Sequence, residues 1–426
     1  MWEKLLQAWK VREVRNGLVF VLLMMVIFRI AANIPLPGVD LVALENFFAA
    51  NRVLGLLNLF SGGTIRSFSI VALGVGPYIT ASIIFQLLGM IVPRIEEIQK
   101  EGEAGQRKIN QWTRLLTVPL AIIQSFGLMA LLRQSQVPIL KQAGVFHLVT
   151  IVCIVTAGTM FLMWLGELMS EKNVGNGVSL IIFAGIVANL PSSASQFAST
   201  ADSLSWISIL VLAAVALATV VGVVFVTEGQ RNIPVQYARQ VRGGASSLAS
   251  GVNSSLPLRV NMVGVIPIIF AISLLLFPTF IAQFLINAKS AWVASAAQWV
   301  VATLQNQTIY GALYFLLVVS FTYFYTAVIF HPDTIAENLQ KQGGFIPGIR
   351  PGKPTSEYLE RVIQRITLGG ALFLGIIAVM PIAFQGVTQT KALALGGTSL
   401  LIVVSVVIES VKQIESQLTM HKYDVY

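Results

Sequence analysis

The sequence predicts an all-α protein that crosses a membrane many times, and three observations lead to this prediction. Of the 426 residues, 55% are hydrophobic and 11% are charged, whereas about a quarter of an average soluble domain is charged. Apolar runs near the length of about 20 residues that a bilayer requires recur along the chain. Lys and Arg are concentrated in alternate segments between these runs.

The chain begins with a segment that resembles a membrane-surface helix. Trp2, Leu5, Leu6 and Trp9 are spaced i, i+3, i+4 and i+7, with basic residues between them, so we expect an amphipathic helix over residues 1–16. Ten membrane spans then follow. They are expected at residues 17–34, 70–92, 113–132, 145–166, 177–190, 205–226, 260–286, 309–330, 366–384 and 392–409.

The distribution of positive charge predicts the orientation. Ten spans place both ends of the chain on one side, and 21 of the 28 Lys and Arg residues fall in segments on that side. By the positive-inside rule both ends are cytoplasmic. The net charge of +9 is then a property of the cytoplasmic face, where it suits anionic lipid or an acidic or nucleic-acid partner.

Ten spans divide into a first half over residues 17–190 and a second half over residues 205–412, joined by an outer loop at 191–204 and followed by a cytoplasmic tail at 413–426. Because five is odd, the second half is inverted relative to the first. The second span of each half contains Gly and Pro, and the fifth is short. Interruptions at matching places in inverted halves indicate the functional centre of a transport protein.

The segment 53–69 precedes the second span and cannot itself cross the bilayer. Its apolar part is about a third of the required length and is broken by Ser61, Gly62 and Gly63. Irregular backbone cannot face lipid, so the segment must fold back into a protein cavity. This pattern favours a pore closed by a short helix.

Two long cytoplasmic loops are expected at residues 227–259 and 331–365. Both are rich in turn-forming and basic residues, which is typical either of charge that sets topology or of a docking surface. A Pro-Gly turn around Arg350 favours docking. The candidate docking residues are Arg231, Arg239, Arg242, Arg350 and Lys353.

Motifs for catalysis or cofactor binding were not found. The sequence has no phosphate-binding loop, no hydrolase motif and no metal-ligand spacing, so we expect neither an enzyme nor a cofactor. The single cysteine, Cys153, lies in an apolar run and is expected in the core. An ion-coupled secondary transporter remains the alternative class, although such coupling needs ionisable groups near the midplane, and the sequence places Arg29, Glu167, Glu228 and Glu409 near span ends.

Several strings, in order along the chain, resemble the bacterial SecY family of protein-conducting channels. They are LFSGGTIRSFSIVALGVGPYITASIIFQLL, KEGEAGQRKINQWTR, TMFLMWLGE, NGVSLIIFAGI, GQRNIPVQYARQ, VNMVGVIP, FIPGIRPG and GGTSLLIV. The resemblance implies two inverted five-helix halves around an hourglass pore. It also implies a ring of aliphatic side chains at the waist, at Val75, Ile79, Val178, Ile182, Ile269 and Ile402. From the residues alone, each of these positions is equally compatible with an ordinary core or lipid-facing site.

The resemblance also assigns a plug and a lateral gate. The plug lies within residues 53–69 and contains Leu56, Leu57, Leu59, Phe60, Ser61, Gly62, Gly63, Thr64, Ile65 and Arg66. The gate between the halves contains Thr80, Gln86, Asn176 and Phe277, which are alternatively ordinary helix-to-helix contacts.

The implied function is a protein-conducting channel of the bacterial plasma membrane. It would pass unfolded secretory polypeptides across the membrane and release transmembrane segments sideways into the bilayer. The implied partners are the membrane subunits SecE and SecG, the motor ATPase SecA, the ribosome, and the secretory and membrane-protein precursors themselves.

Overall fold

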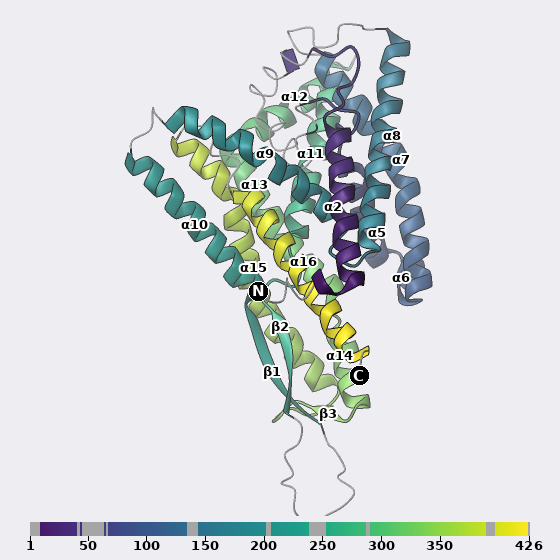
Figure 1. Ribbon diagram of the computed structural model, residues 1–426, viewed down its shortest axis with the longest axis vertical. Helices are drawn as coiled ribbons and strands as arrows, with labels where there is room; N and C mark the ends of the chain where they lie inside the picture. The colour runs from purple at the N-terminus through teal and green to yellow at the C-terminus, as the bar shows by residue number, and fades with distance from the viewer. Residues whose placement is uncertain are drawn as a thin grey trace, which may run out of the picture.

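The computed structural model describes residues 9–40, 43–44, 64, 67–133, 144–201, 206–237, 253–286, 290–388 and 397–424. Within these residues the protein is a bundle of helices with a small sheet at one end (Figure 1). The helices and strands are α2 (Arg12–Ala32), α5 (Gly76–Ile91), α6 (Pro93–Lys100), α7 (Glu103–Arg133), α8 (Val145–Ser170), α9 (Gly177–Ala201), α10 (Trp206–Glu228), β1 (Gln230–Tyr237), β2 (Asn253–Arg259), α11 (Ile266–Leu285), α12 (Ala291–Gln305), α13 (Gln307–Ile329), α14 (Pro332–Lys341), β3 (Gly344–Phe345), α15 (Lys353–Thr388) and α16 (Gly397–Asp424).

Each of the ten predicted spans overlaps one of these helices. Among the described residues, five helices are long and apolar enough to cross a membrane, and a sixth span is possible if α5 and α6 are counted together. The protein is therefore a multi-pass helical membrane protein. The total of ten crossings remains a prediction.

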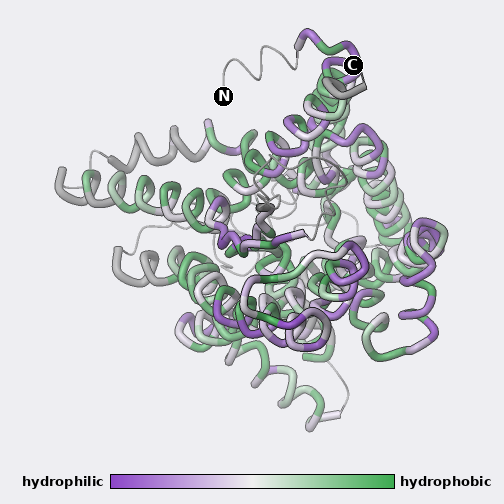
Figure 2. The backbone as a smooth tube through the Cα atoms, turned by 90° about the horizontal axis from the view of Figure 1, so that it is seen from below, coloured by the Kyte–Doolittle hydropathy of each residue, from purple (hydrophilic) through white to green (hydrophobic). Residues whose placement is uncertain are grey.

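The outer surface of the bundle is apolar, as contact with lipid requires. Large hydrophobic side chains are exposed on several helices, among them Leu115, Phe146, Leu210 and Phe225. Cys153 is also exposed on α8, so the prediction that it lies in the core is wrong. Figure 2 looks from the sheet end and shows hydrophilic residues concentrated in the nearer segments, over largely hydrophobic helices.

Proline lies in the first turn of several helices, and one proline follows a sharp bend between two of them. Four helices, α5, α6, α11 and α14, have Pro in their first turn, where a missing N–H costs no hydrogen bond. Pro93 also disfavours helical backbone at the residue before it, and Val92 is extended, with φ −104° and ψ 108°. The result is a bend of 103° between α5 and α6, which turns α6 away from the direction of the span.

Three boundaries differ from the sequence prediction. The first helix of the bundle begins at Arg12, so residues 12–16 of the expected surface helix belong to α2, and Trp9 and Lys10 are its only described residues in helical conformation before α2. Residues 70–75 form turns, and the helix of the second span begins at Gly76. The helix α9 continues past Pro191 to Ala201, so most of the expected outer loop is helical.

The sheet was not predicted, and it amends the all-α expectation. Its strand order is β2-β1-β3, with β1 antiparallel to both neighbours. Ile233 of β1 pairs with Leu256 of β2, and the buried side chains of Ile233, Val235 and Leu258 pack into one cluster with Leu339 of α14 and Leu359 of α15. The two long loops predicted at residues 227–259 and 331–365 therefore fold together into one unit. This end of the molecule, called the sheet end below, also contains the start of α2 and the end of α16 (Figure 1).

Candidate functional site

The six predicted ring positions lie in a single apolar cluster. Val75, Ile182, Ile269 and Ile402 are members of its buried core, with exposed fractions of 1%, 1%, 7% and 2%. Ile79 and Val178 are partly buried and pack against it. They come from α5 and the residue before it, from α9, from α11 and from α16. Helices of both predicted halves therefore meet in one aliphatic centre.

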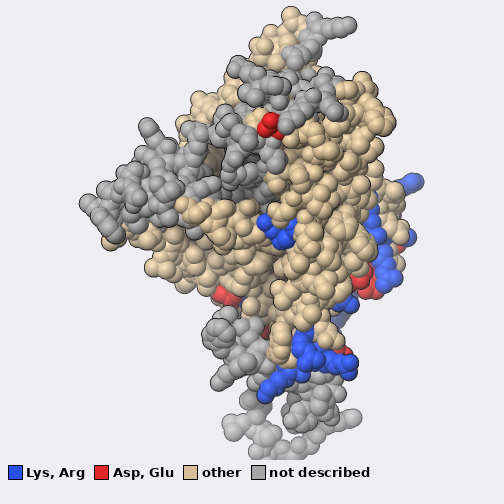
Figure 3. Space-filling view, turned by 45° about the horizontal axis from the view of Figure 1, so that its top comes forward, with Lys and Arg blue, Asp and Glu red and all other residues tan. Residues whose placement is uncertain are grey.

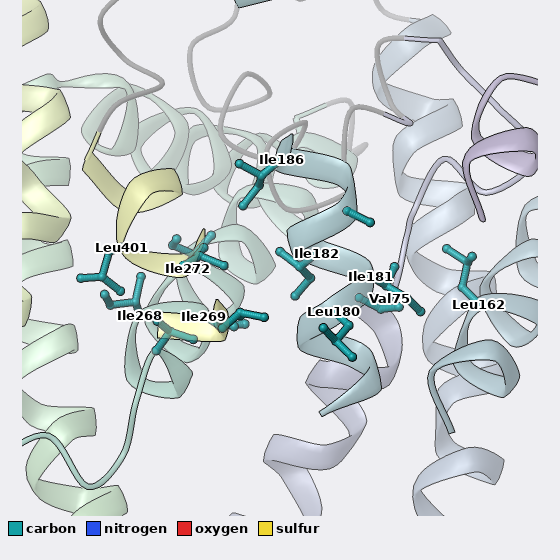
Figure 4. Packing of buried hydrophobic residues seen from close by; sticks show 14 of the residues in the cluster. Val75, Leu162, Leu180, Ile181, Ile182, Ile186, Ile268, Ile269, Ile272 and Leu401 are labelled. Atoms are coloured by element: carbon teal, nitrogen blue, oxygen red, sulfur yellow. The ribbon is translucent and has the colours of Figure 1, made fainter. Parts of the chain in front are cut away.

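The cluster is larger than the predicted ring. Figure 4 shows Ile182 and Ile186 on the side of α9 that faces Ile269 and Ile272 of α11. Ile186 extends the stripe of Val178 and Ile182 by one helical turn, so the i, i+4 spacing could have identified it from the sequence. Membership of the cluster therefore does not by itself distinguish the six ring positions from their neighbours.

Most of the predicted plug lies outside the described residues, namely Leu56, Leu57, Leu59, Phe60, Ser61, Gly62, Gly63, Ile65 and Arg66. Thr64 is described and fully buried, and its hydroxyl donates a hydrogen bond to the carbonyl of Ala72, at 3.2 Å.

The residues after Thr64 are fixed to the end of α2. The Ser67 hydroxyl donates to the carbonyl of Ala32 at 2.9 Å. The backbone N–H groups of Leu36 and Ile70 donate to the carbonyls of Phe68 and Ile34, at 2.9 and 3.0 Å. The predicted plug is thus followed by a firmly held segment.

The four predicted gate residues have different surroundings. The Thr80 hydroxyl donates within α5 to Gly76, at 3.0 Å. The Gln86 amide donates to the Ser82 hydroxyl at 3.3 Å, while its side-chain oxygen is buried without a hydrogen-bond partner. Asn176 caps α9, because its side-chain oxygen accepts from the N–H groups of Val178 and Ser179. The Phe277 side chain lies outside the described part of α11.

Helix α11 meets α5 and α7 along a boundary between the predicted halves. We call this boundary the front seam. Near the sheet end it contains a buried cluster of Ile83 on α5, Phe270 on α11 and Tyr325 on α13. The Phe270 ring stands edge-on to Phe321 and Tyr325, with centroid distances of 5.9 and 5.7 Å. The sequence analysis did not select these aromatic residues, because many spans contain Phe and Tyr.

The predicted docking residues lie partly within the described sheet end. Arg231 on β1, Arg350 between β3 and α15, and Lys353 at the start of α15 are exposed. Arg239 and Arg242 lie outside the described residues. The backbone around Arg350 is fixed, since the buried Thr355 donates its hydroxyl hydrogen bond to the Arg350 carbonyl at 2.9 Å. Gly348 and Gly352 on either side have φ of +82° and +96°, which only glycine adopts readily.

Ion pairs join helices near the sheet end. Arg114 of α7 lies 2.7 Å from Glu167 of α8, and Lys412 of α16 lies 2.7 Å from Glu228 of α10. On the exposed α6, a hydrogen bond from Lys100 lowers the pKa of Glu96. Figure 3 shows Lys and Arg over the lower part of the described surface, while most of its upper part carries neither charge. The charge is therefore gathered at one end of the bundle.

The fold and this centre define a class of protein: a multi-pass helical membrane protein whose helices converge on one aliphatic cluster. Comparison with known proteins then identifies the family. The SecY family model matches residues 69–411, and the chain is 44% identical to the protein translocase subunit SecY of Streptomyces galbus, over 98% of both chains. The chain belongs to the SecY family.

Solved structures show that the fold is shared. A structure of a protein-conducting channel matches with a TM-score of 0.65 and 17% identity, over 93% of this chain and 91% of the other. Sec61 in a canine ribosome-channel complex matches with a TM-score of 0.62 and 17% identity, over the same shares. The architecture is thus retained where most residues differ.

Proposed function

We propose that this protein is a protein-conducting channel, which passes unfolded secretory polypeptides across the bacterial plasma membrane and releases transmembrane segments sideways into the bilayer. Membership of the SecY family supports this function. The structural observation that carries it is the aliphatic centre to which α5, α9, α11 and α16 all contribute. A narrow apolar constriction excludes water and ions when empty, yet offers a passing chain no strong binding site.

Within this proposal the ring at Val75, Ile79, Val178, Ile182, Ile269 and Ile402 seals the resting pore, and the plug within residues 53–69 covers it. The lateral gate is the front seam, whose apolar contacts lipid tails can replace at little cost. Thr80, Gln86 and Phe277 lie on helices of this seam. Asn176 was predicted for the same gate, but its described bonds are those of a helix cap.

The sheet end is the proposed cytoplasmic docking surface, with both ends of the chain on that side. It presents exposed basic residues on a fixed backbone, which suits an acidic or phosphate-bearing partner. The proposed partners are the ribosome and the motor SecA at this surface, SecE and SecG along the bundle, and anionic lipid at its rim. The match to Sec61 in a ribosome-channel complex supports the first of these.

The first experiment tests the path of the polypeptide. A photo-reactive amino acid at Ile402 should cross-link to a secretory chain stalled during export, because that position lies in the aliphatic centre. The matched control is Val407 on the same helix, which is exposed and should label lipid instead. Equal labelling from both positions would contradict the proposed path.

The second experiment separates a channel from an ion-coupled transporter. Replacing Ile182 and Ile402 by glycine should raise the ion conductance of the idle protein, because a widened ring stays wet. A transporter with these changes should lose uptake without leaking. The ion pairs of Glu167 and Glu228 at helix ends also favour the channel, since coupling requires charges near the midplane.

A further inference from the structure

The described helices of the two proposed halves meet along two main seams. One is the front seam, where α11 packs against α5 and α7. The other, which we call the back seam, is formed by α16 against α9 and α2. If the front seam is to open to lipid, the halves must turn about a region that stays together, and the back seam is the available place.

The back seam contains a specific polar contact at the sheet end. Residues 171–176 form the turn between α8 and α9, and the side-chain amide of Gln417 on α16 donates to two of its carbonyls. The distances are 3.0 Å to Asn173 and 3.4 Å to Lys172. One side chain of the second half thus holds the backbone of a turn in the first half.

A close approach adds to this contact about two turns earlier on α16. A Cβ atom placed on Gly175 would lie 2.8 Å from the Ser410 hydroxyl oxygen, so the Ser410 side chain of α16 lies directly against the turn at residue 175. The Ser410 oxygen is buried without a hydrogen-bond partner. Helix α2 supports the other side of the turn, where the Lys172 ammonium lies 5.1 Å from the centre of the Phe20 ring.

Helix α9 is consequently attached to the second half at both of its ends. It begins at Gly177, directly after the turn that Gln417 holds, and ends at Ala201, from which the chain passes into α10 at Trp206. Two rigid bodies joined at two points can rotate only about the line through them. That line runs along α9, and α9 also carries Val178 and Ile182 of the proposed ring.

We propose that Gln417, Ser410 and Gly175 form a pivot that stays closed while the front seam opens. They are positioning residues, which keep α9 and α16 at a fixed spacing and so place Val178 and Ile182 against Ile402. The inference rests on the proposed function and adds a second attachment point, at the sheet end, to the covalent connection between the halves. Hinges of this kind commonly use a few residues at the ends of elements.

The test compares disulfides across the two seams in the full-length protein, in membranes, with Cys153→Ser as background. Gly175→Cys with Ser410→Cys places two thiols across the pivot. A Cβ atom at residue 175 would lie 2.8 Å from the Ser410 Oγ, the atom that the sulfur introduced at residue 410 replaces, so the two sulfurs can come within bonding distance. Ile83→Cys with Phe270→Cys spans the front seam as the matched pair. Disulfide formation is read on gels, and export of a secretory precursor is measured before and after reduction.

We expect both pairs to cross-link. The pivot disulfide should leave export unchanged, whereas the front disulfide should abolish it until reduction restores it. A pivot disulfide that blocks export, or a pair that does not cross-link in the folded protein, would overturn the pivot. Absence of export even from the parent protein, with normal cross-linking, would instead refute the proposed function, and the pivot with it.

A second variant tests the pivot if the protein with the two cysteines does not fold. Gln417→Leu keeps the volume of the side chain but removes its donor, and Gln413→Leu, one turn earlier on α16, is the control. At equal abundance, Gln417→Leu should increase the ion leak of the idle channel while export continues, because α9 and α16 lose their fixed spacing. A leak equal to that of Gln413→Leu would count against the pivot.

Discussion

Single residues decide how closely the helices of this protein approach. Gly158 on α8 is an example, since a Cβ atom there would clash with the carbonyl oxygen of Ile70. That carbonyl belongs to the turn that leads from the proposed plug into α5. A glycine in the middle of a helix is otherwise unfavourable by about 1 kcal/mol relative to alanine, so its presence here is explained by the contact.

We expect Gly158→Ala to destabilise the protein by about 1–3 kcal/mol, because backbone must move to relieve the clash. Gly369→Ala on α15 is the control, since no atom lies within 4 Å of its added Cβ. It should be neutral or stabilising by up to about 1 kcal/mol. Thermal unfolding in detergent measures both, and equal melting temperatures would show that the turn yields easily.

A second residue, Gln86 of the proposed gate on α5, has an unpaired buried atom. Its buried side-chain oxygen has no hydrogen-bond partner, which costs on the order of 1–3 kcal/mol. Gln86→Leu removes this cost and should stabilise the closed gate.

Export measured with signal sequences of graded hydrophobicity should then require a more apolar signal. The control is Gln106→Leu, an exposed change on α7 away from the seam, which should leave the requirement unchanged. If weak signals open the Gln86→Leu channel as readily as the parent, the oxygen does not affect the gate.

At the scale of elements, the sheet end is a small folded unit with a core of its own. Leu359 of α15 is fully buried there beside Ile233 and Leu258 of the sheet. Truncating a buried leucine to alanine typically costs about 2–5 kcal/mol. We therefore expect Leu359→Ala to loosen the sheet from α15 and to weaken binding of ribosomes and of the motor.

Limited proteolysis of the sheet and co-sedimentation with ribosomes would measure these effects. Glu360→Ala, the exposed neighbour on the same helix, should change neither. The ion leak of the idle channel should also stay at the parent level, because the aliphatic centre is a separate cluster. A large leak from Leu359→Ala would show that the two units are coupled.

At the scale of the whole molecule, the positive charge gathers at the sheet end (Figure 3). Topology alone requires much of this charge, so its amount does not prove docking. Position does distinguish the two explanations. Arg350 lies on a turn that a hydrogen bond from Thr355 fixes, whereas Arg107 is an exposed residue on helix α7.

We expect Arg350→Glu to weaken ribosome or motor binding strongly and to reduce its dependence on salt, because a specific phosphate or carboxylate contact is lost. Arg107→Glu changes the net charge by the same amount and should have a smaller effect. Binding measured over a range of salt concentrations tests this. Equal losses from both variants would indicate that general charge attraction explains the affinity.

The sequence by itself determined the membrane class, a helix in each of the ten predicted spans and the gathering of charge. These properties depend on local composition, because every apolar run of sufficient length must satisfy its own backbone hydrogen bonds as a helix in lipid. The sequence also revealed the family resemblance, since the resemblance rests on strings such as FIPGIRPG that lie along the chain in order.

Only the tertiary structure decided which residues meet. The strands of the sheet were missed because β1 and β2 pair across 15 intervening residues and bury one face against α15, so their stability is not local. In the spans nearly every position is aliphatic, and hydrophobicity cannot tell a residue at the centre from one facing lipid. Gln417 contacts the turn at 171–176, and Gly158 lies against Ile70. Both contacts depend on how helices far apart in sequence pack, and short-range sequence patterns do not predict this packing.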